Sequence, residues 1–170
     1  MEKDNTINVA IGFATGRSNF QKVLKTNVYN WEESGLTEKE SVRLNLFVAY
    51  DLKYKNTKST DYTNIGKDVR NLIDDTYFIG GEAIQKEIDD LIDANVITEK
   101  EALLFFEKGY AGKRNAVLYA ALKSKMSYLI FLDDDEYPMA VTNTRSTTIW
   151  SGQHVLSEHL QHIRYADITN

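Results

Sequence analysis

Cysteine is absent from this sequence of 170 residues, and proline occurs only once, at Pro138. Without cysteine the chain has no disulfide framework, no thiolate metal site and no cysteine nucleophile. No apolar run approaches the roughly 18 residues of a membrane span, and the N-terminal stretch MEKDNTINV is acidic and polar where a secretory signal would be basic and then apolar. We therefore expect a cytoplasmic protein with no membrane span in this chain.

Positive charge is also scarce. The chain has 20 lysine and arginine residues against 25 aspartate and glutamate residues, a formal net charge of -5 at pH 7. This balance argues against a protein that neutralises the phosphates of nucleic acid, although it allows a local basic site. Hydrophobic residues make up 42% of the sequence, and the length suits one domain. We expect a single folded domain over residues 1–170.

Apolar runs and helical periodicity alternate along the chain, which predicts an α/β fold. Strands are expected at Ile7 to Ala14 and Leu44 to Tyr50, and they enclose a helix from about Asn19 to Trp31, an order that favours a parallel pair. A brief strand is expected at Tyr77 to Gly81, and a continuously apolar strand, typical of a sheet covered on both faces, at Tyr128 to Leu132. We predict a three-layer α/β/α, Rossmann-like fold around a mainly parallel sheet.

The segment between the second strand and the later glycine-rich stretch is expected to lie outside this framework. Residues Lys53 to Asn64 are polar and predict an exposed loop, and the periodic apolar positions that follow predict a helical insert around residues 66–108. Two helix starts have the capping-box spacing, in which a serine or threonine precedes glutamate or glutamine by three residues: Ser18 and Thr98.

Four consecutive acids follow the most apolar strand, in the stretch YLIFLDDDEYP. Ligands bind beyond the carboxyl ends of strands in open α/β sheets, which is where Asp133, Asp134 and Asp135 begin. Two like charges about 4 Å apart repel by about 1 kcal/mol in water and about 4 kcal/mol at an effective dielectric constant near 20, and a hard divalent cation would offset this. Strand alternation would place Asp133 and Asp135 on one side and Asp134 on the other. The alternative is a solvated acidic turn.

A glycine, two basic residues and an asparagine stand where a later helix is expected to begin, at Gly112, Lys113, Arg114 and Asn115. The free amides and positive dipole of a helix N-terminus favour an anion, and the basic side chains add to that charge. The stretch matches neither of the phosphate-loop patterns GxxxxGK[ST] and GxGxxG, and a helix start with a solvated basic face is the alternative. This helix leads directly into the acidic strand, so the two motifs form one unit.

These motifs together resemble the nucleotide-sugar-binding half of a GT-A-fold glycosyltransferase, family 2-like. The matching stretches are INVAIGFATGR, the second strand closing on an aspartate, GKRNA at residues 112–116, and YLIFLDDDEYP. The resemblance implies that Asp133 and Asp135 form a DxD motif that holds Mn²⁺ or Mg²⁺ on the diphosphate of a sugar donor. It implies that Asp134, the middle residue, lies near the ribose or the sugar.

The same resemblance implies roles for residues outside the acidic run. Asp51 matches the acid that contacts the nucleotide base, and Thr15 and Arg17 lie in the loop that lines the nucleoside pocket. Arg114 and Asn115 match an "RN" pair found beside the nucleotide.

The implied activity is transfer of the sugar to a hydroxyl of a glycan or other acceptor, as in polysaccharide synthesis. The catalytic base is expected beyond Asn170, so we expect this chain to be the N-terminal part of a longer enzyme, peripheral to the inner face of a membrane. A nucleotidyltransferase of related fold, suggested by FATGRS, and a non-catalytic metal- or nucleotide-binding module remain alternatives. A phosphatase with an aspartyl nucleophile would need DxDx[TV], but Tyr137 occupies the last position.

The three histidines lie close together near the end of the chain, in HVLSEHLQH. His159 and His162 share one face of an expected helix and could supply a metal ligand. Neither a thiolate nor an HExxH pattern supports zinc, and the apolar residues between them are typical of helix packing. We favour the structural interpretation for His154, His159 and His162.

Overall fold

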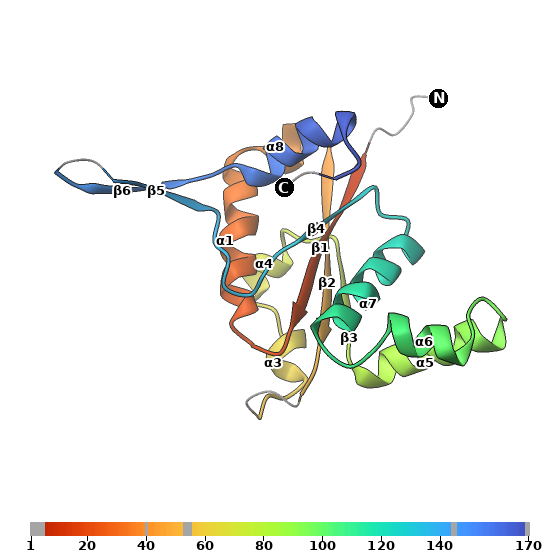
Figure 1. Cartoon of the computed structure of the whole chain (residues 1–170). Helices are drawn as coiled ribbons and strands as arrows, with labels where there is room; N and C mark the ends of the chain where they lie inside the picture. The colour runs from red at the N-terminus through yellow and green to blue at the C-terminus, as the bar shows by residue number, and fades with distance from the viewer. Residues whose placement is uncertain (1–5, 40, 53–55, 144–145, 169–170) are drawn as a thin grey trace.

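A four-stranded parallel sheet forms the centre of the computed structural model, which describes residues 6–39, 41–52, 56–143 and 146–168. Its strands are β1 (Ile7–Thr15), β2 (Val42–Tyr50), β3 (Asp75–Ile79) and β4 (Tyr128–Phe131), in the order β3-β2-β1-β4 (Figure 1). All three neighbouring pairs are parallel. The predicted α/β class and mainly parallel sheet are therefore confirmed.

The strand order reverses at β1. The chain runs outward from β1 through β2 to β3 and then returns to the opposite side of β1 with β4. In the β1–β4 register, Gly12 is opposite Phe131, so both strands reach their carboxyl ends at the same edge of the sheet. Ligands of open α/β sheets bind at such a reversal, which makes the loops after β1 and β4 the place to look for a site.

Alternate residues of the central strands pack into two separate apolar clusters, as strand geometry requires. Val9, Ile11 and Phe13 of β1 belong to the first cluster, together with the buried face of helix α1 (Phe20–Glu33). Ala10 belongs to the second, with Ala116, Val117 and Ala121 of helix α7 (Tyr110–Lys123). Burial on both sides explains why these strands read as continuous apolar runs. The finer assignment to a three-layer GT-A architecture stays a prediction.

The segment expected to be a helical insert contains a strand of the sheet. Residues 66–108 hold α4 (Lys67–Arg70), α5 (Gly81–Asp93) and α6 (Glu99–Phe105), but they also hold β3, which pairs with β2. The prediction of an insert outside the sheet is therefore wrong for β3, which also begins two residues before the expected Tyr77. Figure 1 shows α5 and α6 extending away from the sheet beyond α7.

The two predicted capping boxes have opposite outcomes. At the start of α6, Thr98 Oγ1 accepts from the Glu101 amide at 3.3 Å, and Glu101 Oε2 accepts from the Thr98 amide at 2.8 Å. At the start of α1 the N-cap is Asn19, whose side chain makes no capping hydrogen bond. The Ser18 box is wrong because α1 begins one residue too late for that serine to be its cap.

The remaining elements are short. The expected loop at 53–64 contains α3 (Thr60–Thr63), while its residues 53–55 lie outside the described part of the chain. Helix α2 (Leu36–Lys39) precedes β2, and α8 (Val155–His162) continues into a 3-10 turn, η1 (Ile163–Tyr165). Among the described residues, no helix is both long and apolar enough to cross a membrane.

An antiparallel hairpin, which the sequence did not predict, follows the acidic run. Strands β5 (Met139–Asn143) and β6 (Thr148–Gly152) pair with each other and form a sheet of their own. Figure 1 shows this hairpin projecting away from the rest of the molecule. The hairpin therefore does not extend the central sheet.

Candidate functional site

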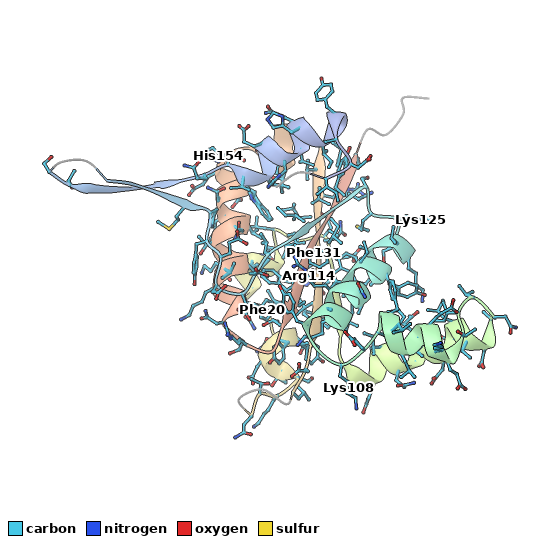
Figure 2. The ribbon with its side chains drawn as sticks, in the orientation of Figure 1. Phe20, Lys108, Arg114, Lys125, Phe131 and His154 are labelled. Atoms are coloured by element: carbon cyan, nitrogen blue, oxygen red, sulfur yellow. The ribbon has the colours of Figure 1, made fainter. Side chains whose placement is uncertain are left out.

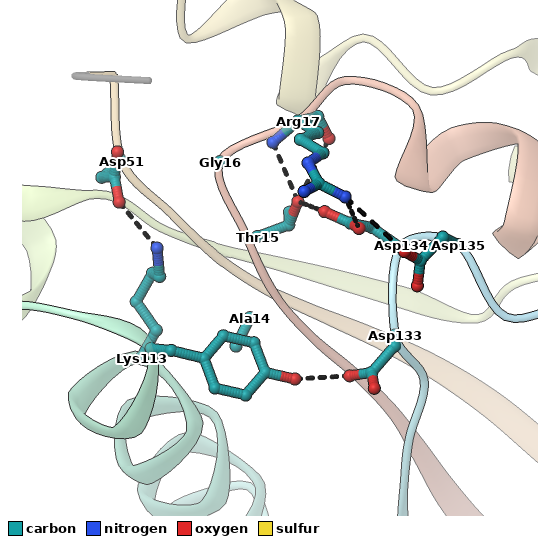
Figure 3. A pocket seen from close by; sticks show the side chains of 10 residues that line it. Ala14, Thr15, Gly16, Arg17, Asp51, Lys113, Asp133, Asp134 and Asp135 are labelled. Carbon is teal, nitrogen blue, oxygen red and sulfur yellow. Dashed lines mark hydrogen bonds and ion pairs between the residues drawn. The ribbon is translucent and has the colours of Figure 1, made fainter. Parts of the chain in front are cut away.

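The loops at the carboxyl edge of the sheet enclose a cavity of about 470 Å³ (Figure 3). Thr15 ends β1, Asp51 follows β2, and Asp133 to Asp135 follow β4, while Lys113 comes from the first turns of α7. Of the nine residues that the sequence singled out, seven line this cavity: Thr15, Arg17, Asp51, Lys113, Asp133, Asp134 and Asp135. The other described lining residues are Ala14, Gly16 and Tyr110.

Asp134 joins the loop after β4 to the loop after β1. Its Oδ2 accepts from Thr15 Oγ1 at 2.6 Å, and its Oδ1 accepts from Arg17 Nη1 at 3.1 Å. The amide of Arg17 in turn donates to Thr15 Oγ1 at 2.9 Å. The Asp134 side chain is only 15% exposed, so these bonds compensate for part of the desolvation of its carboxylate. Asp134 therefore holds the loop after β4 against the loop after β1.

Asp133 has a different partner, which the sequence analysis missed. The Tyr110 hydroxyl donates to Asp133 Oδ1. Burial, and then the hydrogen bond to this carboxylate, raise the pKa of Tyr110 to about 12, so the hydroxyl keeps its proton at neutral pH and remains a donor. The only signal in the sequence was the position of Tyr110, three residues before Lys113 at the start of the same helix.

Strand alternation does not decide where the three aspartates point. Strand β4 ends at Phe131, and the Glu136 amide donates to the Asp133 carbonyl at 3.3 Å, so the acids lie in a turn. Asp135 is 74% exposed, and its Oδ2 lies 3.7 Å from the Arg17 Nη1 that also contacts Asp134. The expectation that alternation separates Asp134 from Asp133 and Asp135 is wrong, because one guanidinium reaches two consecutive acids.

A second ion pair crosses the cavity from α7 to the end of β2. Lys113 Nζ lies 2.6 Å from Asp51 Oδ2, with 18% and 42% of the two side chains exposed (Figure 3). Among the described lining residues, four aspartates outnumber two basic side chains, which gives the cavity a formal charge of -2. Arg17 and Lys113 could bind an anion, and one divalent cation would neutralise the excess of carboxylates.

Arg114 and Asn115 do not line this cavity. Figure 2 shows Arg114 beside Phe131, and its guanidinium carbon lies 4.5 Å from the centre of that ring. Asn115 Nδ2 donates to the Phe105 carbonyl at 2.7 Å and so ties the end of α6 to α7. Successive residues of a helix point about 100° apart, so a helix that directs Lys113 into the cavity turns its next two residues away.

The histidines do not form a metal centre. His162 Nε2 lies 3.7 Å from Glu158 Oε2 on the exposed side of α8, while Leu156 and Leu160 are buried in the first apolar cluster. Within the described ranges, no group of three or more histidine, aspartate or glutamate side chains is arranged to hold a metal ion. A cation at the acidic turn would therefore need further oxygen ligands, such as water or the phosphates of a substrate.

No protein-family model, no curated protein and no solved structure matches this chain.

Proposed function

We propose that this chain binds a nucleoside diphosphate sugar through a divalent cation, as the donor-binding domain of a GT-A-fold glycosyltransferase that transfers the sugar to a hydroxyl acceptor. The observation that supports it is the cavity at the strand reversal, where Asp133, Asp134 and Asp135 meet Arg17 and Lys113. A metal-bound diphosphate needs carboxylates on one side and cations on the other, and this cavity offers both.

The acidic turn suits an open Mn²⁺ or Mg²⁺ site, in which the protein supplies only some of the ligands. Asp134 is held by hydrogen bonds from Thr15 and Arg17. Asp135 is 74% exposed and lies farther from Arg17, at 3.7 Å, so Asp133 and Asp135 are the carboxylates that could hold the ion. Tyr110 contacts Oδ1 of Asp133, so Oδ2 can face a cation without loss of that bond. Two carboxylates suffice because such ions commonly take their other ligands from water and substrate phosphates. When bound, the ion would act as a Lewis acid toward the departing nucleoside diphosphate.

The basic side chains would then orient the diphosphate. Lys113 already reaches into the cavity, and Arg17 is held by two carboxylates. Both basic side chains are therefore in position before a ligand binds. A phosphate oxygen can replace Asp51 as the partner of Lys113 and so free that aspartate for the nucleoside. Thr15 keeps the loop after β1 in position through its bond to Asp134.

A thermal-shift panel of UDP, GDP and CDP, each with and without Mn²⁺, tests this proposal. Ligand at about 100 times its Kd stabilises the folded chain by about 2.7 kcal/mol, which for this length raises Tm by roughly 5–10 °C. We expect such a rise with at least one nucleotide in Mn²⁺ and a much smaller one in EDTA. The proposal is wrong if none of the three gives a Mn²⁺-dependent rise, with Mn²⁺ alone as the control.

Lys113 and its neighbour Arg114 should differ sharply in their effect on binding. Lys113→Met removes a cation from the cavity and should weaken nucleotide binding about tenfold, the value of one charge-assisted hydrogen bond of about 1.5 kcal/mol. Arg114→Met changes the same charge outside the cavity and should leave the Kd within about twofold. Isothermal titration of both variants measures this, and equal losses would contradict the assignment of Lys113.

A further inference from the structure

A second cavity lies away from the site, between helices α5, α6 and α7. It measures about 490 Å³, and its lining is almost entirely apolar: Leu91, Val96, Ile97, Glu101, Leu104, Phe105, Phe106 and Tyr119. We call this surface the α5–α6 groove. Among its lining residues, Val96 is 65% exposed, Leu104 70% and Phe105 43%. Large apolar side chains gathered on one surface mark an interaction site, because covering them removes apolar area from water.

The groove is formed before any partner arrives. Its α6 wall begins with the Thr98–Glu101 capping box and ends with Phe105, whose carbonyl accepts from Asn115 of α7. The Phe106 ring packs edge-on against Tyr119 with their centres 5.9 Å apart. On the α5 side, Glu87 accepts from Lys123 Nζ at 2.6 Å, which links α5 to α7. A preformed groove lowers the ordering entropy that a partner would otherwise have to offset.

Acidic residues outnumber basic ones in the segment that forms α5 and α6. Residues 81–108 contain eight acidic and three basic residues, a net charge of -5, which equals the formal charge of the complete chain. The rest of the sequence is therefore balanced. Two copies of this surface would repel each other, and so would an anionic membrane. The charge instead favours a cationic partner.

We propose that the α5–α6 groove binds a cationic amphipathic helix of a partner protein. Apolar side chains one turn apart on such a helix would enter the groove and cover Leu104 and Phe105. Lysines or arginines on its flanks would face the carboxylates of α5 and α6, which carry seven of the eight acidic residues in residues 81–108. The groove lies outside the nucleotide cavity, so this interaction does not depend on the function proposed for that site.

Binding of a model peptide tests the inference. The probe is a fluorescent leucine-lysine peptide of about 14 residues with its leucines on one helical face. We expect it to bind the wild-type chain, with an affinity that falls as salt rises. Leu104→Asn should weaken binding about tenfold, as expected for an apolar anchor. Leu122→Asn is the matched control, because Leu122 is 67% exposed on α7 but lies outside the groove.

Three outcomes would overturn the inference. A peptide of the same composition with its leucines spread around the helix could bind equally well, which would reduce the interaction to charge alone. Sedimentation could show a dimer that Leu104→Asn dissociates, which would make a second copy the partner. Binding to vesicles that contain phosphatidylserine, lost in the same variant, would make the groove a membrane contact. Circular dichroism of both variants confirms that each is folded.

Discussion

The double substitution Asp133→Ala/Asp135→Ala is expected to abolish the Mn²⁺-dependent rise in Tm that a nucleoside diphosphate produces. These two carboxylates are the proposed cation ligands, because Asp134 is held by hydrogen bonds from Thr15 and Arg17, and Asp135 is more exposed and lies farther from Arg17. Without them the cavity keeps two aspartates and two basic side chains among its described lining residues. Its formal charge therefore changes from -2 to zero. We expect the affinity for the metal-nucleotide complex to fall at least about 100-fold, which leaves at most about 0.4 of the original roughly 2.7 kcal/mol of ligand stabilisation.

The fourth acid of the run provides the control. Glu136 follows Asp135 directly, but it is not among the residues that line the cavity, and Glu136→Ala should keep the full shift. The unliganded double variant should melt within a few degrees of the wild-type Tm, because the repulsion between neighbouring carboxylates that it loses offsets the lost Tyr110–Asp133 hydrogen bond and Arg17–Asp135 contact. A double variant that retains the Mn²⁺-dependent shift would disprove the assignment of the cation to these aspartates.

Gly112→Ala is expected to lower the free energy of unfolding by about 3 kcal/mol. A Cβ at Gly112 would lie 1.8 Å from the carbonyl oxygen of Glu107, and this backbone atom cannot rotate away as a flexible side chain would. Either the loop before α7 or the first turn of the helix must shift, and such overpacking costs about 1–3 kcal/mol or more. For a chain of this length the loss corresponds to a drop in Tm of roughly 6–12 °C. Urea denaturation measures it.

Gly81→Ala is the matched control for this substitution. Gly81 also lies at the start of a helix, but no heavy atom comes within 4 Å of a Cβ placed there. Alanine at this position should leave stability unchanged or raise it by about 0.4–1 kcal/mol, because it restricts the unfolded chain. The close approach at Gly112 also sets the start of α7, which carries Tyr110 and Lys113 into the cavity. A Gly112→Ala variant within about 0.5 kcal/mol of wild type would contradict this account.

The sequence alone predicted the class of the fold and most of its central strands. Continuous apolar runs identify β1 and β2, since a strand buried on both faces leaves no polar positions to alternate with. The same kind of run identified β4, although β4 lies at the other edge of the sheet and is half-buried. Helical periodicity identified α1 in the same way. The edge strand β3 was predicted with its position shifted and then included in a helical insert, because its apolar pattern is short and it begins with an exposed aspartate, Asp75.

Much of the candidate site was also predictable, because the topology of a parallel sheet fixes which strand ends lie together. The carboxyl ends of parallel strands meet at one edge of a sheet, so polar residues just after Thr15, Tyr50 and Leu132 had to come close together. The sequence thus determined that Arg17, Asp51 and the three aspartates would be neighbours.

Only the tertiary structure decided what each of these side chains contacts. The phase of α7 relative to β1 directs Lys113 into the cavity, turns Arg114 onto Phe131, and brings in Tyr110, which no motif had identified. The turn after β4 replaces strand alternation, so Arg17 reaches both Asp134 and Asp135. Residue type and order are local properties of a chain. The direction of a side chain at the end of a strand or helix depends on how separate elements pack, and that is set by contacts between residues far apart in the sequence.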